Sequence, residues 1–222
     1  MRIPETSVTI GPSDWEAEGR VAARNVHVAS FEIDAFEAQV DDVACPSCVK
    51  PDVALFAAGD PARAASGLSL EEARAHCEKK GGRVPTDDEW MVAAAGSKPR
   101  RYPWGDTGAV CRRGAWGLAS GPCAAAWQGV AGPDTVGAHP DGDTDFGVHD
   151  LAGNVAEWVV DPRAELAAGA RLRGGSYASA LATELRTWAF RDVDGKALPE
   201  AGVRCVYDSA PPADAWQKAR GL

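Results

Sequence analysis

The chain has 222 residues, a formal net charge of −9 at pH 7, and 24 Gly, 15 Pro and 8 Trp. That length suffices for one large domain with a substantial core, while the acidic balance disfavours an electrostatic grip on nucleic acid. No apolar run of roughly 18 residues is present, which argues against a membrane-spanning helix. The glycines, prolines and tryptophans instead predict an irregular, loop-rich fold pinned by large aromatic side chains.

Two short strands are predicted near the start of the chain. Val8–Gly11 and Phe31–Phe36 both alternate apolar and polar residues, the period of a half-buried strand. Residues 41–68 carry several prolines and a glycine, so this stretch is predicted to be loop with at most a helical turn.

Two helices follow, and each begins with the same local signal. Ser69-Leu-Glu-Glu72 and Thr86-Asp-Asp-Glu89 are capping boxes. The first helix is predicted to stop at Gly81–Gly82 and the second near Gly96. Their buried positions are predicted to include Leu70, Ala73, Cys77, Trp90, Ala93 and Ala94.

Regular structure is predicted to be sparse after the second helix. Residues 97–149 show turn chemistry, and Val155–Val160 and Arg171–Leu172 are predicted strands around a loop. No linker signal interrupts the chain. We therefore predict one domain over residues 1–208 and a polar C-terminal tail over residues 209–222.

The six cysteines can be wholly paired, which favours an oxidising compartment. Cys111 and Cys123 bracket a glycine-containing loop, and closing it would contribute about 3 kcal/mol in the chain-entropy model. Cys45-Pro-Ser-Cys48 is open to three interpretations: a local disulfide, which we favour, a redox or metal-binding pair, or two reduced thiols.

Four segments in one order carry a family resemblance. They are Gly82-Arg-Val-Pro-Thr-Asp-Asp-Glu-Trp90, Tyr102-Pro-Trp-Gly-Asp106, Asp150-Leu-Ala-Gly-Asn-Val-Ala-Glu-Trp158 and Arg171-Leu-Arg-Gly-Gly-Ser-Tyr177. Together they resemble the formylglycine-generating enzyme family, the sulfatase-modifying factors. The resemblance implies an α+β, loop-rich formylglycine-generating-enzyme fold, which is a variant of the C-type lectin architecture with little regular secondary structure.

The resemblance also points to what is missing. Catalytic members bind copper through two cysteines that follow the Arg-Gly-Gly-Ser element, and the matching positions here are Ser179 and Glu184. Copper(I) selects soft thiolates, so we expect no copper and assign no catalytic residue. Cys77 and Cys205 match positions that form a disulfide in animal enzymes of the family.

A structural calcium ion is a further implication of the resemblance. Matching positions in catalytic members bind it through the side chains of Asp150 and Glu157 and the carbonyls of Gly153 and Val155. Hard oxygen ligands at this spacing suit calcium. The alternative is that Asp150 caps a turn and Glu157 pairs with an arginine such as Arg173.

Other polar residues carry weaker signals. Ser179 lacks the Gly-x-Ser-x-Gly elbow of a nucleophile, and Asp141–Asp145 lacks the later ligands of an EF-hand and is interpreted as a solvated acidic loop. The arginines near the C-terminus could anchor buried carboxylates, which we favour, or bind an anion. The residues interpreted as structural are His27, His76, His139, His149, Arg173, Arg186, Arg191, Arg204, Trp104, Trp158 and Trp188.

These observations favour a non-oxidase member of the scaffold. We expect an extracytoplasmic module, periplasmic, cell-surface or secreted, that binds protein, peptide or glycan beside Ser179 and Glu184, with its leader peptide absent from this chain. Two alternatives stay open. One is a diverged metal- or thiol-dependent oxidoreductase with a relocated site, recruiting Cys45 and Cys48. The other is a partner subunit of a true formylglycine-generating oxidase.

Overall fold

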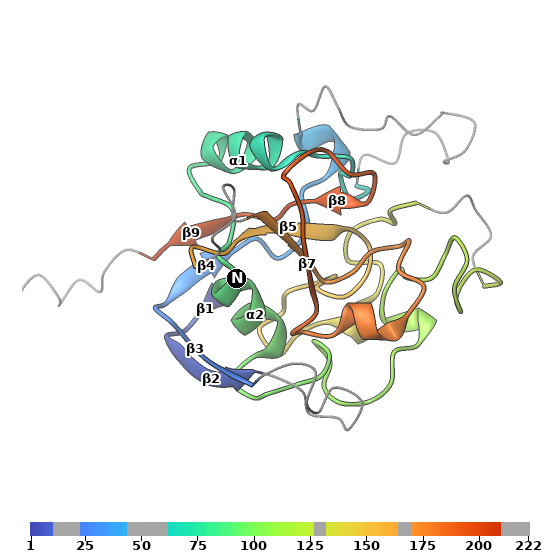
Figure 1. Ribbon diagram of the computed structural model, residues 1–222, viewed down its shortest axis with the longest axis horizontal. Helices are drawn as coiled ribbons and strands as arrows, with labels where there is room; N and C mark the ends of the chain where they lie inside the picture. Colours follow the sequence, from blue (N-terminus) through green and yellow to red (C-terminus); the bar gives the residue numbers. More distant parts are fainter. Residues whose placement is uncertain (11–22, 44–61, 127–131, 164–169, 210–222) are drawn as a thin grey trace, which may run out of the picture.

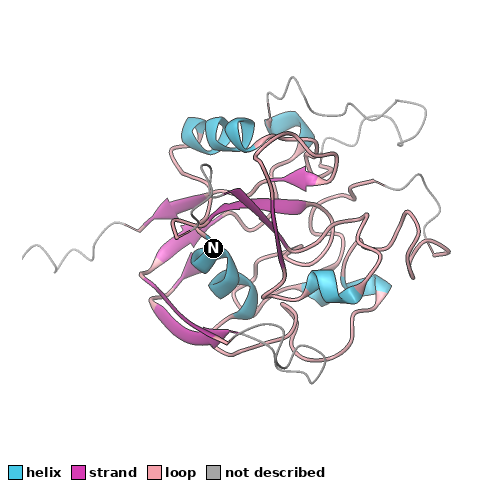
Figure 2. Ribbon diagram, in the orientation of Figure 1, coloured by secondary structure: helices cyan, strands magenta, loops and turns pink. Residues whose placement is uncertain are grey.

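The computed structural model describes residues 1–10, 23–43, 62–126, 132–163 and 170–209. The predicted tail and the Cys45–Cys48 pair therefore lie outside the described residues, apart from Ser209. Within these ranges the structure is dominated by loops (Figure 2). Its helical elements are α1 (Leu70–Lys79), α2 (Asp87–Ala95) and the 3-10 turns η1 (Val40–Asp42), η2 (Cys111–Arg113), η3 (Pro140–Gly142) and η4 (Ala182–Leu185).

The strands in the described part of the chain form three small sheets. A three-stranded antiparallel sheet has the order β1-β4-β9, β2 and β3 form a two-stranded antiparallel ribbon, and a mixed sheet has the order β7-β6-β5-β8. In the mixed sheet, β5 pairs antiparallel with β6 and parallel with β8. The bounds are β1 (Arg2–Ile3), β2 (Thr6–Ile10), β3 (Arg24–Val28), β4 (Phe31–Ile33), β5 (Ala156–Val160), β6 (Ala170–Arg173), β7 (Phe190–Asp192), β8 (Ala201–Gly202) and β9 (Val206–Asp208).

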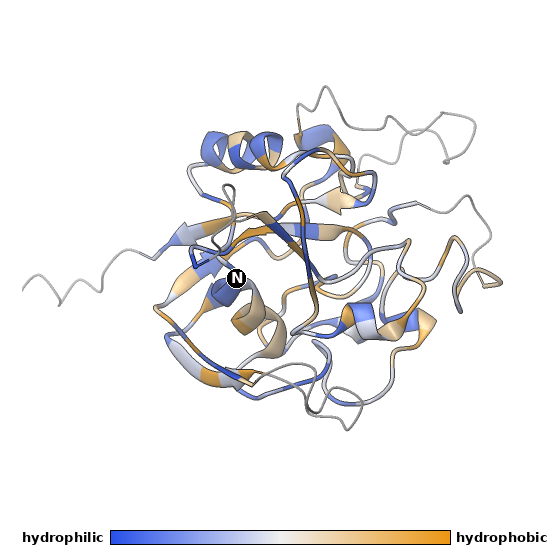
Figure 3. Ribbon diagram, in the orientation of Figure 1, coloured by the Kyte–Doolittle hydropathy of each residue, from blue (hydrophilic) through white to orange (hydrophobic). Residues whose placement is uncertain are grey.

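Both predicted helices and their caps are confirmed. The Ser69 and Thr86 hydroxyls accept the amides of Glu72 and Glu89, whose carboxylates accept the cap amides in return. The two helices differ in hydropathy, as Figure 3 shows. α1 buries one stripe, whereas α2 is buried over most of its length because it packs between the β2–β3 ribbon and β5. All six positions predicted to face the core are buried.

The two faces of β5 belong to different cores. Ala156 and Trp158 pack with α1, and Val159 packs with α2 and the β2–β3 ribbon. The alternation of side chains along a strand causes this division, and it places α1 and α2 on opposite sides of the mixed sheet (Figure 1). Trp158 lies fully buried, and its indole donates to the Leu68 carbonyl at 2.9 Å.

A third cluster lies in the irregular part of the chain. It gathers the loop after the Tyr102–Asp106 element, the turn before β5 and η4. Its members are Tyr102, Ala115, Trp116, Leu118, Cys123, Ala152 and Leu185. Cys123 and Ala152 bring the Cys111–Cys123 loop and the Asp150–Trp158 segment into this cluster.

Candidate functional site

The turn from Asp150 to Val155 has an unusual backbone. Asp150 and Asn154 have φ values of 59° and 55°, and Gly153 has a φ of 100°. Asp and Asn tolerate the left-handed region better than other side chains do. Gly153 is required for a second reason, because a Cβ there would lie 2.7 Å from the Ala115 carbonyl oxygen. The sequence therefore dictates a tight turn that enters β5 with both carboxyl residues buried.

Glu157 is held by an arginine and a tryptophan. Its two carboxylate oxygens accept from the Arg204 guanidinium at 2.6 to 2.9 Å, and Oε2 also accepts from the Trp90 indole at 2.7 Å. Arg204 also donates to the carbonyls of Ala35 and His149. The alternative interpretation of Glu157 as an ion-pair partner is correct in kind, but the arginine is Arg204 and not Arg173.

A third buried carboxyl group, Glu37, joins this turn and was missed by sequence reasoning. Its oxygens accept from the Asn154 side-chain amide and from the Val155 backbone amide. Burial, reinforced by the charges of Asp150 and Glu157, raises the pKa of Glu37 well above its ordinary value. No local pattern marks Glu37, because its partners lie more than a hundred residues away.

The oxygen atoms around this turn are only partly suited to bind a hard cation such as calcium. Three carboxyl groups surround one guanidinium, so Arg204 alone does not balance their charge when all three are ionised. Among the described residues, the Asp150 carboxylate accepts a hydrogen bond from the Gly137 amide. Glu157 does not fit as a ligand in this arrangement, because the donors from Arg204 and Trp90 take the lone-pair directions of both its oxygens.

Among the described residues, no three His, Cys, Asp or Glu side chains are arranged to hold a metal ion. Any ion at this turn would therefore depend on backbone carbonyls such as those of Gly153 and Val155.

Ser179 and Glu184 lie beside one glycine. A Cβ at Gly175, where φ is 67°, would come within 3.0 Å of the Ser179 Oγ and 3.1 Å of the Glu184 carbonyl oxygen. Ser179 is buried and its hydroxyl accepts the Ser176 amide, whereas the exposed Glu184 carboxylate accepts the Leu181 amide. Both side chains stabilise local turns, and neither supplies a soft ligand.

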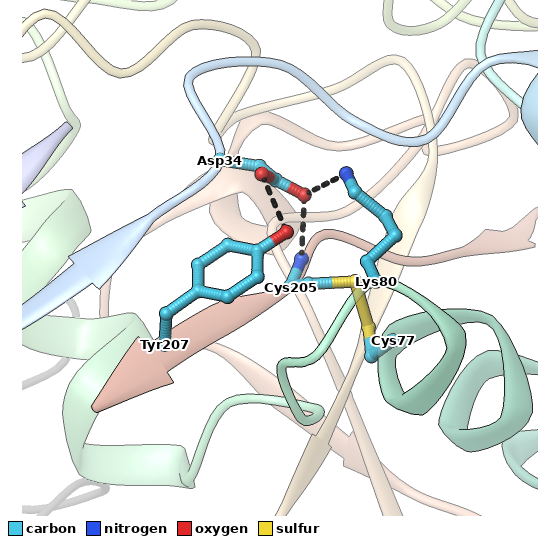
Figure 4. Close-up of a disulfide and its surroundings, with 5 residues drawn as sticks. All are labelled: Asp34, Cys77, Lys80, Cys205 and Tyr207. Atoms are coloured by element: carbon cyan, nitrogen blue, oxygen red, sulfur yellow. Dashed lines mark hydrogen bonds and ion pairs between the residues drawn. A yellow bond between two sulfur atoms is a disulfide. The ribbon is translucent and has the colours of Figure 1, made fainter.

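Two of the three expected disulfides fall within the described residues. Cys77–Cys205 joins α1 to the segment before β9, and both cysteines are fully buried. Figure 4 shows Asp34 beside it, accepting from Lys80 at 2.7 Å, from Tyr207 at 3.1 Å and from the Cys205 amide at 3.3 Å. The Asp34 carboxylate thus fixes both elements that the disulfide links.

The second disulfide, Cys111–Cys123, closes a loop with a sequence separation of 12 residues. The pairing follows the spacing prediction, and the loop belongs to the third hydrophobic cluster.

The arginines near the C-terminus have structural partners. Arg173 is buried and donates to Asp87 at 2.6 Å, and Arg191 pairs with Glu200. These contacts favour anchoring of carboxylates over anion binding. The three tryptophans are packed to different degrees. Trp158 and Trp188 are buried, whereas Trp104 is half-buried and stacks on Tyr102.

The fold and the occupants of the thiol positions define a formylglycine-generating-enzyme scaffold without its copper-binding thiols. Residues 1–209 match the family described as "Sulfatase-modifying factor enzyme 1-like domain", and the chain belongs to this family.

Curated relatives match parts of the chain. "Inactive C-alpha-formylglycine-generating enzyme 2" of Bos taurus is 39% identical over 93 residues, covering 41% of this chain and 31% of that protein. "Hercynine oxygenase" of Mycolicibacterium thermoresistibile is 35% identical over 98 residues, covering 41% of this chain and 19% of that protein. The chain thus matches less than a third of either relative's length.

A solved structure shares the fold. Treponema denticola variable protein 1 superposes with a TM-score of 0.69 at 17% identity, covering 94% of both chains. The predicted α+β, loop-rich fold is confirmed.

Proposed function

We propose that this chain is a non-catalytic member of the family that acts as a binding module outside the cytoplasm. The observation that carries the proposal is the chemistry of Ser179 and Glu184, which match the copper-ligating positions of catalytic members. A buried hydroxyl and an exposed carboxylate, each engaged in a local turn, cannot replace two thiolates at a copper(I) site. The naming of a relative as inactive supports the same conclusion.

The described cysteines support the location. All four are paired in disulfides, as is typical of oxidising compartments. No helix among the described residues is long and apolar enough to cross a membrane. We propose the same ligand class that the sequence led us to expect, which is a protein, peptide or glycan.

Copper binding gives the direct test. The wild-type protein should not compete for copper(I) with a chromogenic chelator, and should form no aldehyde on a cysteine-containing sulfatase-motif peptide. Ser179→Cys/Glu184→Cys introduces a thiol at each of the two matching positions and should gain tight copper(I) binding, since thiolates are the preferred ligands of copper(I).

The matched control is Ser176→Cys/Glu184→Cys, which adds two thiols but leaves position 179 unchanged. Aldehyde formation by the wild type would overturn the proposal. Two titratable thiols in native wild-type protein would favour the rival oxidoreductase, which would use Cys45 and Cys48.

We also propose that one calcium ion supports the Asp150–Val155 turn. Asp150 would supply its carboxylate, Gly153 and Val155 their carbonyls, and the buried carboxyl groups the surrounding negative charge. Calcium would serve as a structural ion that neutralises this charge.

A further inference from the structure

The loop closed by Cys111–Cys123 contains a docked segment, Gly114–Leu118, which we call the strap. Every strap residue is buried, although none belongs to a helix or strand. The Ala115 carbonyl accepts the Asn154 amide at 2.8 Å, and the Leu118 amide donates to the Tyr177 carbonyl at 2.9 Å. The strap therefore lies against both the Asp150–Val155 turn and the turn that carries Ser179.

The residues before the strap have contacts of their own: Arg112 pairs with Asp141 at 2.7 Å, and Arg113 donates to the Thr107 hydroxyl and the Gly108 carbonyl. The residues directly after the strap are held less firmly. Ala119 and Ser120 are exposed, and within the loop the Gly121 amide donates to the Gly117 carbonyl at 3.0 Å. The disulfide, by contrast, joins the two ends of this loop covalently. This covalent link closes the loop that contains the strap.

The two described disulfides differ in access to solvent. Both sulfurs of Cys77–Cys205 belong to residues with 0% exposure. Cys123 is 1% exposed, but Cys111 is half-buried at the surface. Arg112 and Arg113 follow Cys111 directly, and neighbouring positive charge stabilises the Cys111 thiolate that a complete reduction would release. Cys111 is therefore the more exposed end for a reducing thiolate to attack, whereas Cys77 and Cys205 are shielded.

In its docked position, the strap leaves one buried polar atom unsatisfied. Trp116 is 3% exposed, and its indole nitrogen is buried with no hydrogen-bond partner among the residues that the structure describes. A buried unsatisfied donor is unfavourable, because water would bond it in the open state. Opening the strap would relieve this penalty while exposing the apolar ring.

We propose that Cys111–Cys123 is a redox-sensitive clasp, opened by a dithiol, that releases the strap from the Asn154 and Tyr177 turns. The dithiol's thiolate attacks the Cys111 sulfur, and the S–S bond breaks with Cys123 leaving as a thiolate that takes up a proton. The second thiol of the reductant attacks the mixed disulfide and releases Cys111. Two electrons pass to the protein, and the reductant becomes a disulfide.

Graded reduction of the native protein tests the first half of the proposal. Samples are equilibrated with increasing dithiothreitol, alkylated and mapped by mass spectrometry. Cys111 and Cys123 should be alkylated at a dithiothreitol concentration about tenfold or more below that needed for Cys77 and Cys205. Reduction of both bridges at one concentration would overturn the proposal.

Hydrogen exchange on the partly reduced protein tests the second half. The Asn154 and Leu118 amides should exchange about tenfold or more faster, whereas the Val160 amide, bonded to Pro85, should be unchanged. Cys111→Ser/Cys123→Ser should show the same exchange without reductant, and Ser120→Ala should not. If that double variant fails to fold, the wild-type experiment decides alone. Retained protection of Asn154 and Leu118 after clasp reduction contradicts the proposal.

Discussion

Asp87 is a fully buried carboxylate surrounded by arginines. It lies 2.6 Å from Arg173, 3.0 Å from Arg24 and 3.1 Å from Arg171, measured from carboxylate oxygen to guanidinium nitrogen. Burial alone would raise the pKa of Asp87, but the hydrogen bond from Arg173 and the charges of the other arginines hold it below its ordinary value. As the first residue of α2, Asp87 also lies at the positive end of the helix dipole.

The lowered pKa of Asp87 predicts a loss of stability in acid. Because the folded pKa lies below the unfolded value, this contribution is complete above the unfolded pKa and is lost as the pH falls through the folded one. Asp87→Asn should lose about 3–5 kcal/mol at pH 7, because it leaves Arg173 buried without its counter-charge. Urea unfolding from pH 7 to pH 3 should also show a flatter profile for the variant.

Asp88→Asn is the matched control. Asp88 is the next residue on α2 and pairs with Arg24 and Arg163, but its side chain is 25% exposed. Removing this charge should cost less than about 1 kcal/mol, as is usual for exposed pairs. Equal losses from both substitutions would show that the burial of Asp87 is not what makes its charge important.

The elements that sequence reasoning located are those with a local signal. The capping boxes at Ser69 and Thr86 each involve residues three apart, so both helix starts could be predicted. Val8–Gly11 and Phe31–Phe36 correspond to β2 and β4, with shifted ends. β1 and β8 have two residues each, too few to carry a period. β3 alternates as well, in Asn25-Val-His-Val28, so its strand carries the same period-2 signal as β2 and β4.

Cys77–Cys205 should stabilise the fold more than Cys111–Cys123. Its sequence separation is 128 residues against 12, and the chain-entropy model gives about 5 kcal/mol against about 3 kcal/mol before strain. Cys77→Ala/Cys205→Ala should therefore lower the urea midpoint more than Cys111→Ser/Cys123→Ser does. A smaller effect of the buried bridge would mean that the Asp34 contacts to Lys80 and Tyr207 already hold α1 against β9.

The buried charges of the whole molecule could be predicted only in outline. Asp150 and Glu157 were recognised because they share one motif. Arg204 lies 47 residues beyond Glu157, and Glu37 precedes its Asn154 partner by 117. Such partners are set by how β4, β5 and the segment before β9 pack together, and no local pattern encodes that packing. The sequence could therefore predict that an arginine pairs with Glu157, but not which arginine.

Calcium should raise the melting temperature of the protein if an ion supports the Asp150–Val155 turn. An ion bound only by the folded state stabilises it by about 2.7 kcal/mol at a hundredfold excess over its dissociation constant. A chelator should therefore lower the melting temperature, and calcium should restore it. Glu157→Gln is a poor probe, because it also leaves Arg204 buried and unpaired.

Asp150→Asn is the cleaner variant for this experiment. Asn tolerates the left-handed backbone at this position, and the substitution leaves the Glu157–Arg204 pair in place. The variant should stay folded and lose its response to both chelator and calcium. If the wild-type melting temperature ignores both reagents and no ion is retained on purification, the Arg204 guanidinium is the cation of this turn, and the raised pKa of Glu37 favours its neutral form and so lessens the negative charge around Asp150 and Glu157.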